Sequence, residues 1–148
     1  MLTEINGDLF AHTTGRVPVH CIASDHAMGA GIAVPMAGKY GLRKPMDELG
    51  MLPWPSCLYI NGVLNMVTKR WSSGKTALRV GGNFEQGRPT YESFRKALGH
   101  CAEVCRLNNI TKVVMPRIGC GLDGLDWNIV RRMISETMKD IDVLVCTL

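Results

Sequence analysis

The chain has 148 residues, of which 46% are hydrophobic and 20% charged, and its formal net charge is +4 at pH 7. This length and composition predict a single domain over residues 1–148 with its own core, and they exclude a disordered chain. No apolar run approaches the roughly 18 residues that a bilayer span needs, so no membrane association is expected. The mild positive charge fits an anionic ligand and is too weak to indicate a nucleic-acid-binding protein.

The six cysteines lie mostly in apolar strand-like runs or on one face of a predicted helix, without a C-x-x-C pair. The four histidines are scattered, so we expect reduced thiols, no metal site and no cofactor. The first ten residues lack a basic segment, which argues against a signal peptide and favours a cytoplasmic protein. We expect the protein to be a monomer.

In chain order, the first apolar run, residues 17–23, predicts a strand. Residues 29–41 start at a glycine turn and are expected to be helical in part, because Pro35 disfavours a regular helix. Residues 56–69 read as two strands, and Asn61-Gly62 between them is a strong two-residue hairpin signal.

Residues 70–88 are rich in glycine and basic residues, and we expect a long loop or a ragged hairpin there. A helix is predicted to begin at Pro89, because apolar residues then recur at spacings of three and four, and to end near Asn108. Residues 112–116 predict a short strand closed by proline.

Asp126 is positioned to cap a last helix, and residues 142–148 predict the last strand. This alternation of strands and helices predicts an α/β protein with a mostly parallel sheet covered on both faces. Ligands of such sheets bind in the loops at the carboxyl ends of the strands.

The stretch MPRIGCGLDGLDW, residues 115–127, spells G-x-G-x-x-G through Gly119, Gly121 and Gly124. A dinucleotide-binding fold would require an acidic residue about 20 positions later, and that region, VLVCTL, has none. A P-loop also fails, because the GKT at 74–76 would need a glycine where Lys69 stands. What remains is either a phosphate cradle of backbone N–H groups or a tight turn.

A second glycine turn, MGAGIA at 28–33, also follows a predicted strand. Two such loops facing each other across a crevice would suit a pyrophosphate, which presents two anionic groups. This pairing favours the phosphate cradle over a simple turn.

Five segments occur in the order GDLF (7–10), HCIASDHAMGAGIAV (20–34), VTKR (67–70), PTYES (89–93) and MPRIGCGLDGLDW (115–127). Together they resemble the macrodomain family, and most closely its branch of terminal ADP-ribose protein glycohydrolases. The resemblance implies a three-layer α/β/α sandwich with a mixed, largely parallel sheet and an ADP-ribose cleft at the strand ends.

The resemblance also implies functional residues. A lysine and an aspartate carry the chemistry of this branch, and they match Lys69 and Asp123. Asp8 is expected to accept a hydrogen bond from the adenine amino group. The remaining residues expected to contact ADP-ribose are Leu9, Ser24, Met28, Gly29, Ala30, Gly31, Ile32, Pro116, Ile118, Gly119, Cys120, Gly121 and Leu122.

These residue types suit the expected reaction. A neutral lysine amine can attack the C1″ aldehyde of a ring-opened ribose and form a Schiff base, and a carboxylate beside C1″ can act as general base. Direct attack by a water molecule that Asp123 activates is the alternative.

The sequence departs from the branch at two places. Ala23 replaces a serine near the distal ribose, with Ser24 next to it, and residues 70–88 are longer than expected. That segment suggests either a lid, a contact for a modified partner such as a nucleic acid strand, or a solvated loop.

Three functions follow from the resemblance. The first is a hydrolase of ADP-ribose attached to acidic side chains that also deacetylates O-acetyl-ADP-ribose. The second is a hydrolase of ADP-ribosylated nucleic acid or of ADP-ribose 1″-phosphate. The third is a non-catalytic ADP-ribose reader, which the presence of both Lys69 and Asp123 disfavours.

Overall fold

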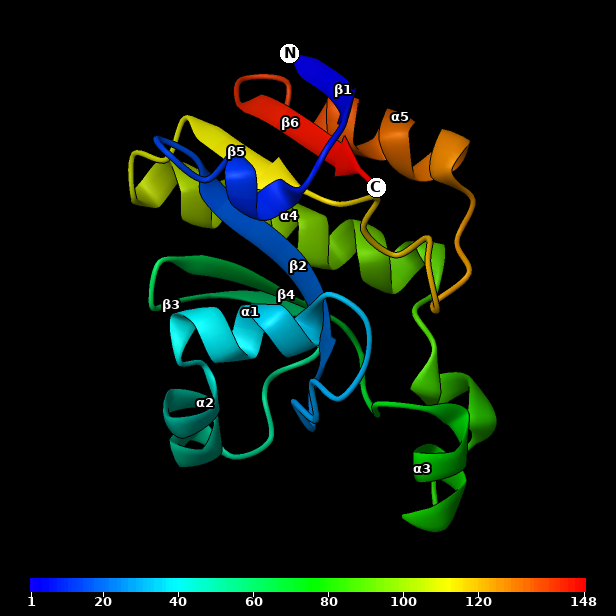
Figure 1. The fold of residues 1–148 in the computed structure, drawn as a ribbon. Helices are drawn as coiled ribbons and strands as arrows, with labels where there is room; N and C mark the ends of the chain where they lie inside the picture. The colour runs from blue at the N-terminus through cyan, green and yellow to red at the C-terminus, as the bar shows by residue number, and fades with distance from the viewer.

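The computed structural model describes all residues 1–148 and contains one six-stranded mixed sheet with the strand order β1-β6-β5-β2-β4-β3 (Figure 1). All neighbouring strands are parallel except β3 and β4, which form an antiparallel hairpin. The strands are β1 (Leu2–Asn6), β2 (Val17–Ala23), β3 (Ser56–Ile60), β4 (Val63–Lys69), β5 (Lys112–Met115) and β6 (Asp142–Thr147).

Helices cover both faces of this sheet, so the predicted three-layer α/β/α arrangement is confirmed (Figure 1). The helices α1 and α2 lie on one face, and α4 and α5 lie on the other. The helices are α1 (Ala33–Tyr40), α2 (Arg43–Leu49), α3 (Gly74–Arg79), α4 (Tyr91–Leu107) and α5 (Trp127–Thr137), with short 3-10 helices η1 (Leu9–Ala11) and η2 (Phe84–Gly87).

Two hydrophobic cores correspond to the two faces. The larger core, of 20 buried residues, joins α4 and α5 to the sheet and includes Phe94 and Ile134, which are fully buried. The smaller core, of 13 buried residues, joins α1 and α2 to the other face through Met36 and Met46. The two layers fix the sheet from both sides, and the carboxyl edges of β2, β4 and β5 stay open for a ligand.

Local signals explain most of these elements. Asn61 and Gly62 have φ values of 49° and 77°, the left-handed conformation that a tight two-residue hairpin turn between β3 and β4 needs. Asp126 caps α5 by accepting a hydrogen bond from the Asn128 N–H, as expected. Thr90 and Ser93 cap α4 reciprocally, so Pro89 precedes the cap and is not the first helical residue.

Three parts of the sequence prediction were wrong or incomplete. Residues 70–88 contain α3 and η2 rather than a loop or ragged hairpin, because Ser73 and Asn83 each cap a helix too short to show a periodic apolar face. The edge strand β1 was missed because only Leu2 and Ile5 are apolar in it. The helix α2 was missed because its interior proline, Pro45, argues against a helix.

All six cysteines are free thiols, as the sequence predicted. No helix has the length and apolar character to cross a membrane.

Candidate functional site

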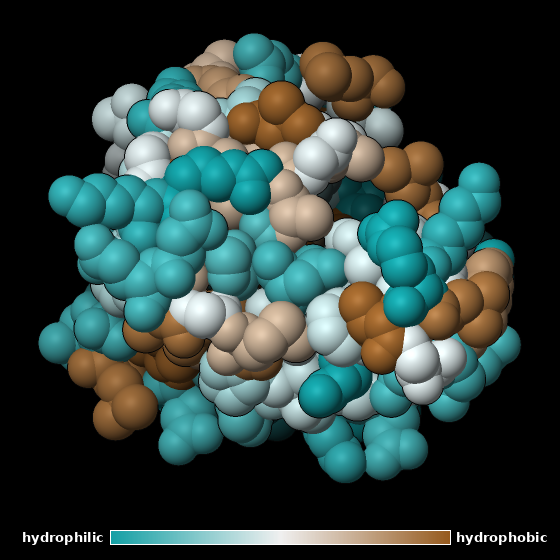
Figure 2. Space-filling view, turned by 90° about the horizontal axis from the view of Figure 1, so that it is seen from below, coloured by the Kyte–Doolittle hydropathy of each residue, from teal (hydrophilic) through white to brown (hydrophobic).

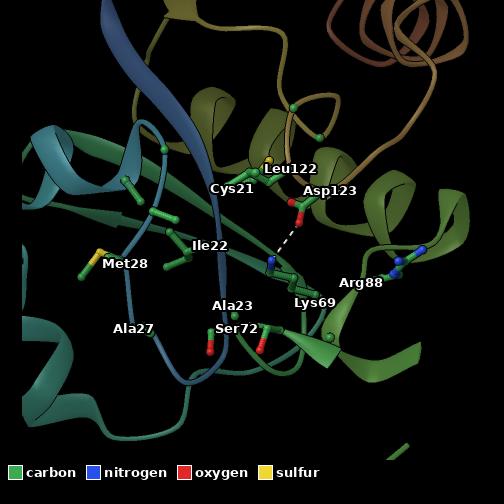
Figure 3. A pocket seen from close by; sticks show the side chains of 18 of the residues that line it. Cys21, Ile22, Ala23, Ala27, Met28, Lys69, Ser72, Arg88, Leu122 and Asp123 are labelled. Carbon is green, nitrogen blue, oxygen red and sulfur yellow. Dashed lines mark hydrogen bonds and ion pairs between the residues drawn. The ribbon is translucent and has the colours of Figure 1, made fainter. Parts of the chain in front are cut away.

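A cavity of about 730 Å³ opens at the carboxyl ends of β2, β4 and β5. Four segments surround it: the end of β2, the loop that leads into α1, residues 69–88, and the loop between β5 and α5. Figure 2 looks onto the molecule from this side and shows a face of mixed hydrophilic and hydrophobic side chains with a hollow between them. Figure 3 shows the cavity from close by, with Lys69 and Asp123 at its centre.

The first wall is the loop before α1, and it offers free backbone donors. None of the N–H groups of residues 28–33 donates a hydrogen bond within the protein. The residue at the N-cap of α1, Ile32, provides no side-chain cap. Unpaired N–H groups at a helix start attract anions, so this wall suits a phosphate.

Arg43 of α2 supports this loop on the side away from the cavity. Its guanidinium donates to the carbonyl oxygens of His26 at 3.0 Å, of Met28 at 3.3 Å, and of Ala27. A carbonyl and the N–H of the following residue point in opposite directions across a planar peptide. The N–H groups of Met28 and Gly29 therefore point away from Arg43, and both residues line the cavity.

The second wall is the loop between β5 and α5. The N–H groups of Gly119, Gly121, Leu122 and Asp123 also donate no hydrogen bond within the protein. Gly119 has a φ of 75°, and a Cβ there would lie 3.1 Å from the Phe94 ring, so this position strongly favours glycine. The Leu122 side chain, which is 85% exposed, reaches towards the first wall, because its Cδ1 lies 4.0 Å from the position that a Cβ on Gly31 would occupy.

Lys69 and Asp123 meet between these walls. Lys69 ends β4, and its Nζ lies 2.7 Å from Oδ1 of Asp123 (Figure 3). The two side chains are only 16% and 18% exposed, so little water screens the pair. At this distance the Asp123 carboxylate can exchange a proton directly with the Lys69 amine.

The thiols of the two cysteines near this pair, Cys21 and Cys120, are unreactive. Burial and the neighbouring Asp123 raise the pKa of the Cys21 thiol above its ordinary value. Burial raises the pKa of Cys120 to about 11, so both stay protonated at neutral pH. Cys21 lines the cavity, and its protonated thiol is a poor nucleophile.

No group of three His, Cys, Asp or Glu residues comes together as a metal ion would require. The charged residues among those that line the cavity are Lys69, Asp123, Arg88 and Arg117.

Known proteins are similar to this chain in sequence and in fold. The Macro domain family profile matches residues 62–134. The human protein named ADP-ribose glycohydrolase OARD1 is 36% identical over 152 aligned positions, which cover 99% of this chain and 91% of the human protein.

The chain is a macrodomain.

Solved structures agree with the fold of this macrodomain. The macrodomain of Mycobacterium tuberculosis DarG superposes with a TM-score of 0.77 at 21% identity, over 100% of this chain and 98% of that one. Thermosipho africanus DarTG, solved in complex with ADP-ribose, superposes with a TM-score of 0.68 at 17% identity, over 98% of this chain and 41% of that one.

The macrodomain fold brings most of the expected site residues to one cavity. Besides Lys69 and Asp123, the residues that line it are Met28, Gly29, Ala30, Gly31, Ile32, Pro116, Ile118, Gly119, Gly121 and Leu122. The two glycine loops, more than 80 residues apart in the chain, thus form opposite walls as the sequence suggested.

Four expected residues lie outside the cavity lining. Asp8 is exposed and caps η1 by accepting from the Phe10 N–H at 3.1 Å. Leu9 is buried in the smaller core. Cys120 turns its Sγ to the Ile118 carbonyl oxygen. Ser24 is 1% exposed, and its Oγ has no hydrogen-bond partner, so Ala23 rather than Ser24 faces the cavity.

Sequence reasoning missed the contribution of residues 70–88 to this cavity. Six lining residues come from that segment: Ser72, Ser73, Gly74, Phe84, Gly87 and Arg88. The unusual length and basic composition of the segment were the available signals, and they did not indicate which side chains face the site.

Proposed function

We propose that this macrodomain is a hydrolase that binds ADP-ribose and releases it from acidic side chains, and that it also deacetylates O-acetyl-ADP-ribose. The observation that carries the proposal is the Lys69–Asp123 pair, 2.7 Å apart between two loops with free N–H groups. The activity in the name of the human relative supports it. Both substrates are acyl esters of a ribose, so one site can serve both.

In the proposed binding mode, the pyrophosphate lies between the two glycine loops. Their free N–H groups would replace the water that hydrates the phosphates. Asp8, on the exposed turn at η1, would accept the hydrogen bond from the adenine amino group. The distal ribose would then lie over Ala23 with C1″ next to Lys69.

Two chemical routes start from this arrangement. In the first, Asp123 takes a proton from Lys69, and the Nζ attacks C1″. The bond to the acyl oxygen breaks, and the target carboxylate leaves with the electron pair. The lysine glycosylamine then opens at its C1″–O4″ bond, O4″ takes a proton, and the resulting Schiff base is hydrolysed by water. In the second, Asp123 takes a proton from a water molecule that attacks C1″ directly. Borohydride separates the routes, because it reduces a lysine Schiff base to a stable adduct that mass spectrometry places on Lys69.

The decisive experiment measures ADP-ribose release from a glutamate-linked substrate by wild type, Lys69→Ala and Asp123→Ala. We expect each substitution to lower turnover at least 100-fold, the scale typical of lost nucleophilic or acid–base catalysis. Lys44→Ala is the matched control, because Lys44 is an exposed residue of α2 outside the cavity.

The alternatives give different results in the same assay. Binding of ADP-ribose without any release by wild type would identify a reader. Faster release from thymidine-linked ADP-ribose or from the 1″-phosphate than from the glutamate ester would identify a different leaving group.

A further inference from the structure

Residues 70–88 form a compact surface beside the site. The N–H groups of Arg70 and Trp71 both donate to the Gln86 carbonyl oxygen, at 3.1 and 3.0 Å, which ties the two ends of the segment together. Gly87 lies so close to the Ser73–Gly74 backbone that a Cβ on it would sit 2.2 Å away. Residues 70–88 therefore form an ordered structural unit held by its own contacts, called the unit below.

This unit adjoins the reactive end of the cavity. It follows Lys69 directly in the chain, and the N–H of Ser72 donates to Oδ2 of Asp25 at 2.9 Å, which anchors the unit to the loop after β2. Its residues Phe84 and Arg88 line the cavity. If C1″ lies at Lys69, whatever is attached to C1″ must extend past this unit.

The unit is a surface of unpaired positive charge. It contains four basic residues, Arg70, Lys75, Arg79 and Arg88, against one acidic residue, Glu85. None of these four takes part in any of the seven ion pairs of the protein. Because these cations have no acidic partner in the chain, they are available to an acidic ligand.

The same unit exposes large apolar side chains. Leu78 is 58% exposed, Val80 50% and Phe84 42%. On the right of Figure 2, where this unit lies, hydrophobic and hydrophilic side chains stand next to one another. A surface that is both cationic and apolar complements a segment that is both acidic and apolar.

The aromatic rings favour a peptide over a nucleic acid strand. Binding of single strands relies on aromatic faces that are free to stack on bases. Here the Arg88 guanidinium lies 5.0 Å from the centre of the Phe84 ring, and that of Arg70 lies 5.7 Å from the centre of the Trp71 ring. The backbone of Gly74 also packs on the Phe84 ring, and the exposed Leu78 and Val80 cannot stack on bases.

We propose that residues 70–88 are a docking surface for the ADP-ribosylated protein itself, and that they bind an acidic, apolar peptide that flanks the modified side chain. This inference rests on the proposed function only for the position of the leaving group. It makes the segment a determinant of which targets are processed and leaves the chemistry at Lys69 and Asp123 unchanged.

The test compares two ADP-ribosylated glutamate peptides, one with acidic and leucine-containing flanks and one with glycine–serine flanks. Fluorescence anisotropy measures their affinity for the Lys69→Ala protein, which limits turnover during the measurement. We expect the acidic peptide to bind about tenfold more tightly, from several exposed ion pairs and apolar contacts, and the preference to shrink in high salt.

Charge reversal then locates the surface. In Lys75→Glu/Arg79→Glu we expect the preference to disappear. The matched control, Lys112→Glu, changes an exposed cation at the amino end of β5, the edge of the sheet opposite the site, and we expect the preference to remain.

Equal affinity of the wild-type surface for the two peptides would overturn the proposal. So would a loss of the preference in Lys112→Glu as large as in Lys75→Glu/Arg79→Glu. A preference for an ADP-ribosylated oligothymidylate that the double variant abolishes would overturn it in favour of nucleic acid. Failure of the proposed function is visible separately, as the absence of ADP-ribose release by protein that retains Lys69.

Discussion

Replacement of Arg43 by glutamine tests whether α2 organises the first glycine loop for phosphate binding. The guanidinium donates to three consecutive carbonyl groups, those of residues 26, 27 and 28. Glutamine is too short and has only one donor group, so the loop would lose this support. Arg43 does not line the cavity, so the substitution removes no direct contact with a ligand there.

The size of the effect follows from the loop conformation. His26 and Met28 have φ values of 42° and 47°, an arrangement that costs non-glycine residues about 1–3 kcal/mol each and persists only when the surroundings hold it. Hydrogen bonds to a charged donor contribute roughly 1.5–3 kcal/mol. If the substitution destabilises the binding-competent loop conformation by about 1.4 kcal/mol relative to the others, the Kd for ADP-ribose rises about tenfold.

Isothermal titration calorimetry with ADP-ribose is the assay. We expect Arg43→Gln to raise the Kd about tenfold and Arg43→Lys to give an intermediate value, because an ammonium cannot reach three carbonyls as a guanidinium fork does. Lys44→Gln, the exposed neighbour on α2, should bind as wild type does.

Unchanged affinity in Arg43→Gln would refute the reasoning, even if the melting temperature fell. Equal losses in Arg43→Gln and Lys44→Gln would refute it as well, because the effect would then belong to α2 in general.

Two further substitutions probe the fold. Gly119→Ala should lower the free energy of unfolding, measured in urea, by about 1–3 kcal/mol, because the φ of Gly119 is 75° and a Cβ would crowd Phe94. The control Gly121→Ala should change this free energy little, because nothing lies within 4 Å of a Cβ there. Equal losses of free energy in the two variants would contradict this account. His20, buried with its Nε2 2.6 Å from Oδ1 of Asn65, has its pKa lowered by burial to about 4, so the folded protein keeps it neutral. The unfolded chain takes up a proton near pH 6.5, so the free energy of unfolding should fall by about 2 kcal/mol from pH 7 to pH 5. His20→Leu should flatten this slope, and an unchanged slope would show that another group causes it.

Local signals in the sequence determined much of the fold. Alternation of apolar runs with helical periodicity predicted five of the six strands within a residue or two, as well as α4 and α5. The Asn61-Gly62 turn and the Asp126 cap act over a few residues, so sequence reasoning could recognise them. The same holds for the glycine loops, because their backbone freedom is a local property.

The family resemblance added the residues of the site. It pointed to Lys69 and Asp123 as partners, which no local pattern could do, because a lysine at a strand end is ordinarily a solvated side chain. Most of the expected contact residues do line the cavity. Ser24 does not, because it follows the end of β2 and its side chain is buried below the surface.

Tertiary structure alone decided the remainder. Lys69 and Asp123 lie 54 positions apart and meet at 2.7 Å only because β4 and the loop after β5 end at the same edge of the sheet. The strand β1 exists because it pairs with β6, some 140 residues away. Arg43 can donate to the three carbonyl groups of residues 26–28 only after α2 has packed on the sheet. Residues 70–88 are ordered by hydrogen bonds between their two ends, from Arg70 and Trp71 to Gln86. Such contacts depend on how distant segments pack, and the sequence carries no periodic signal for them.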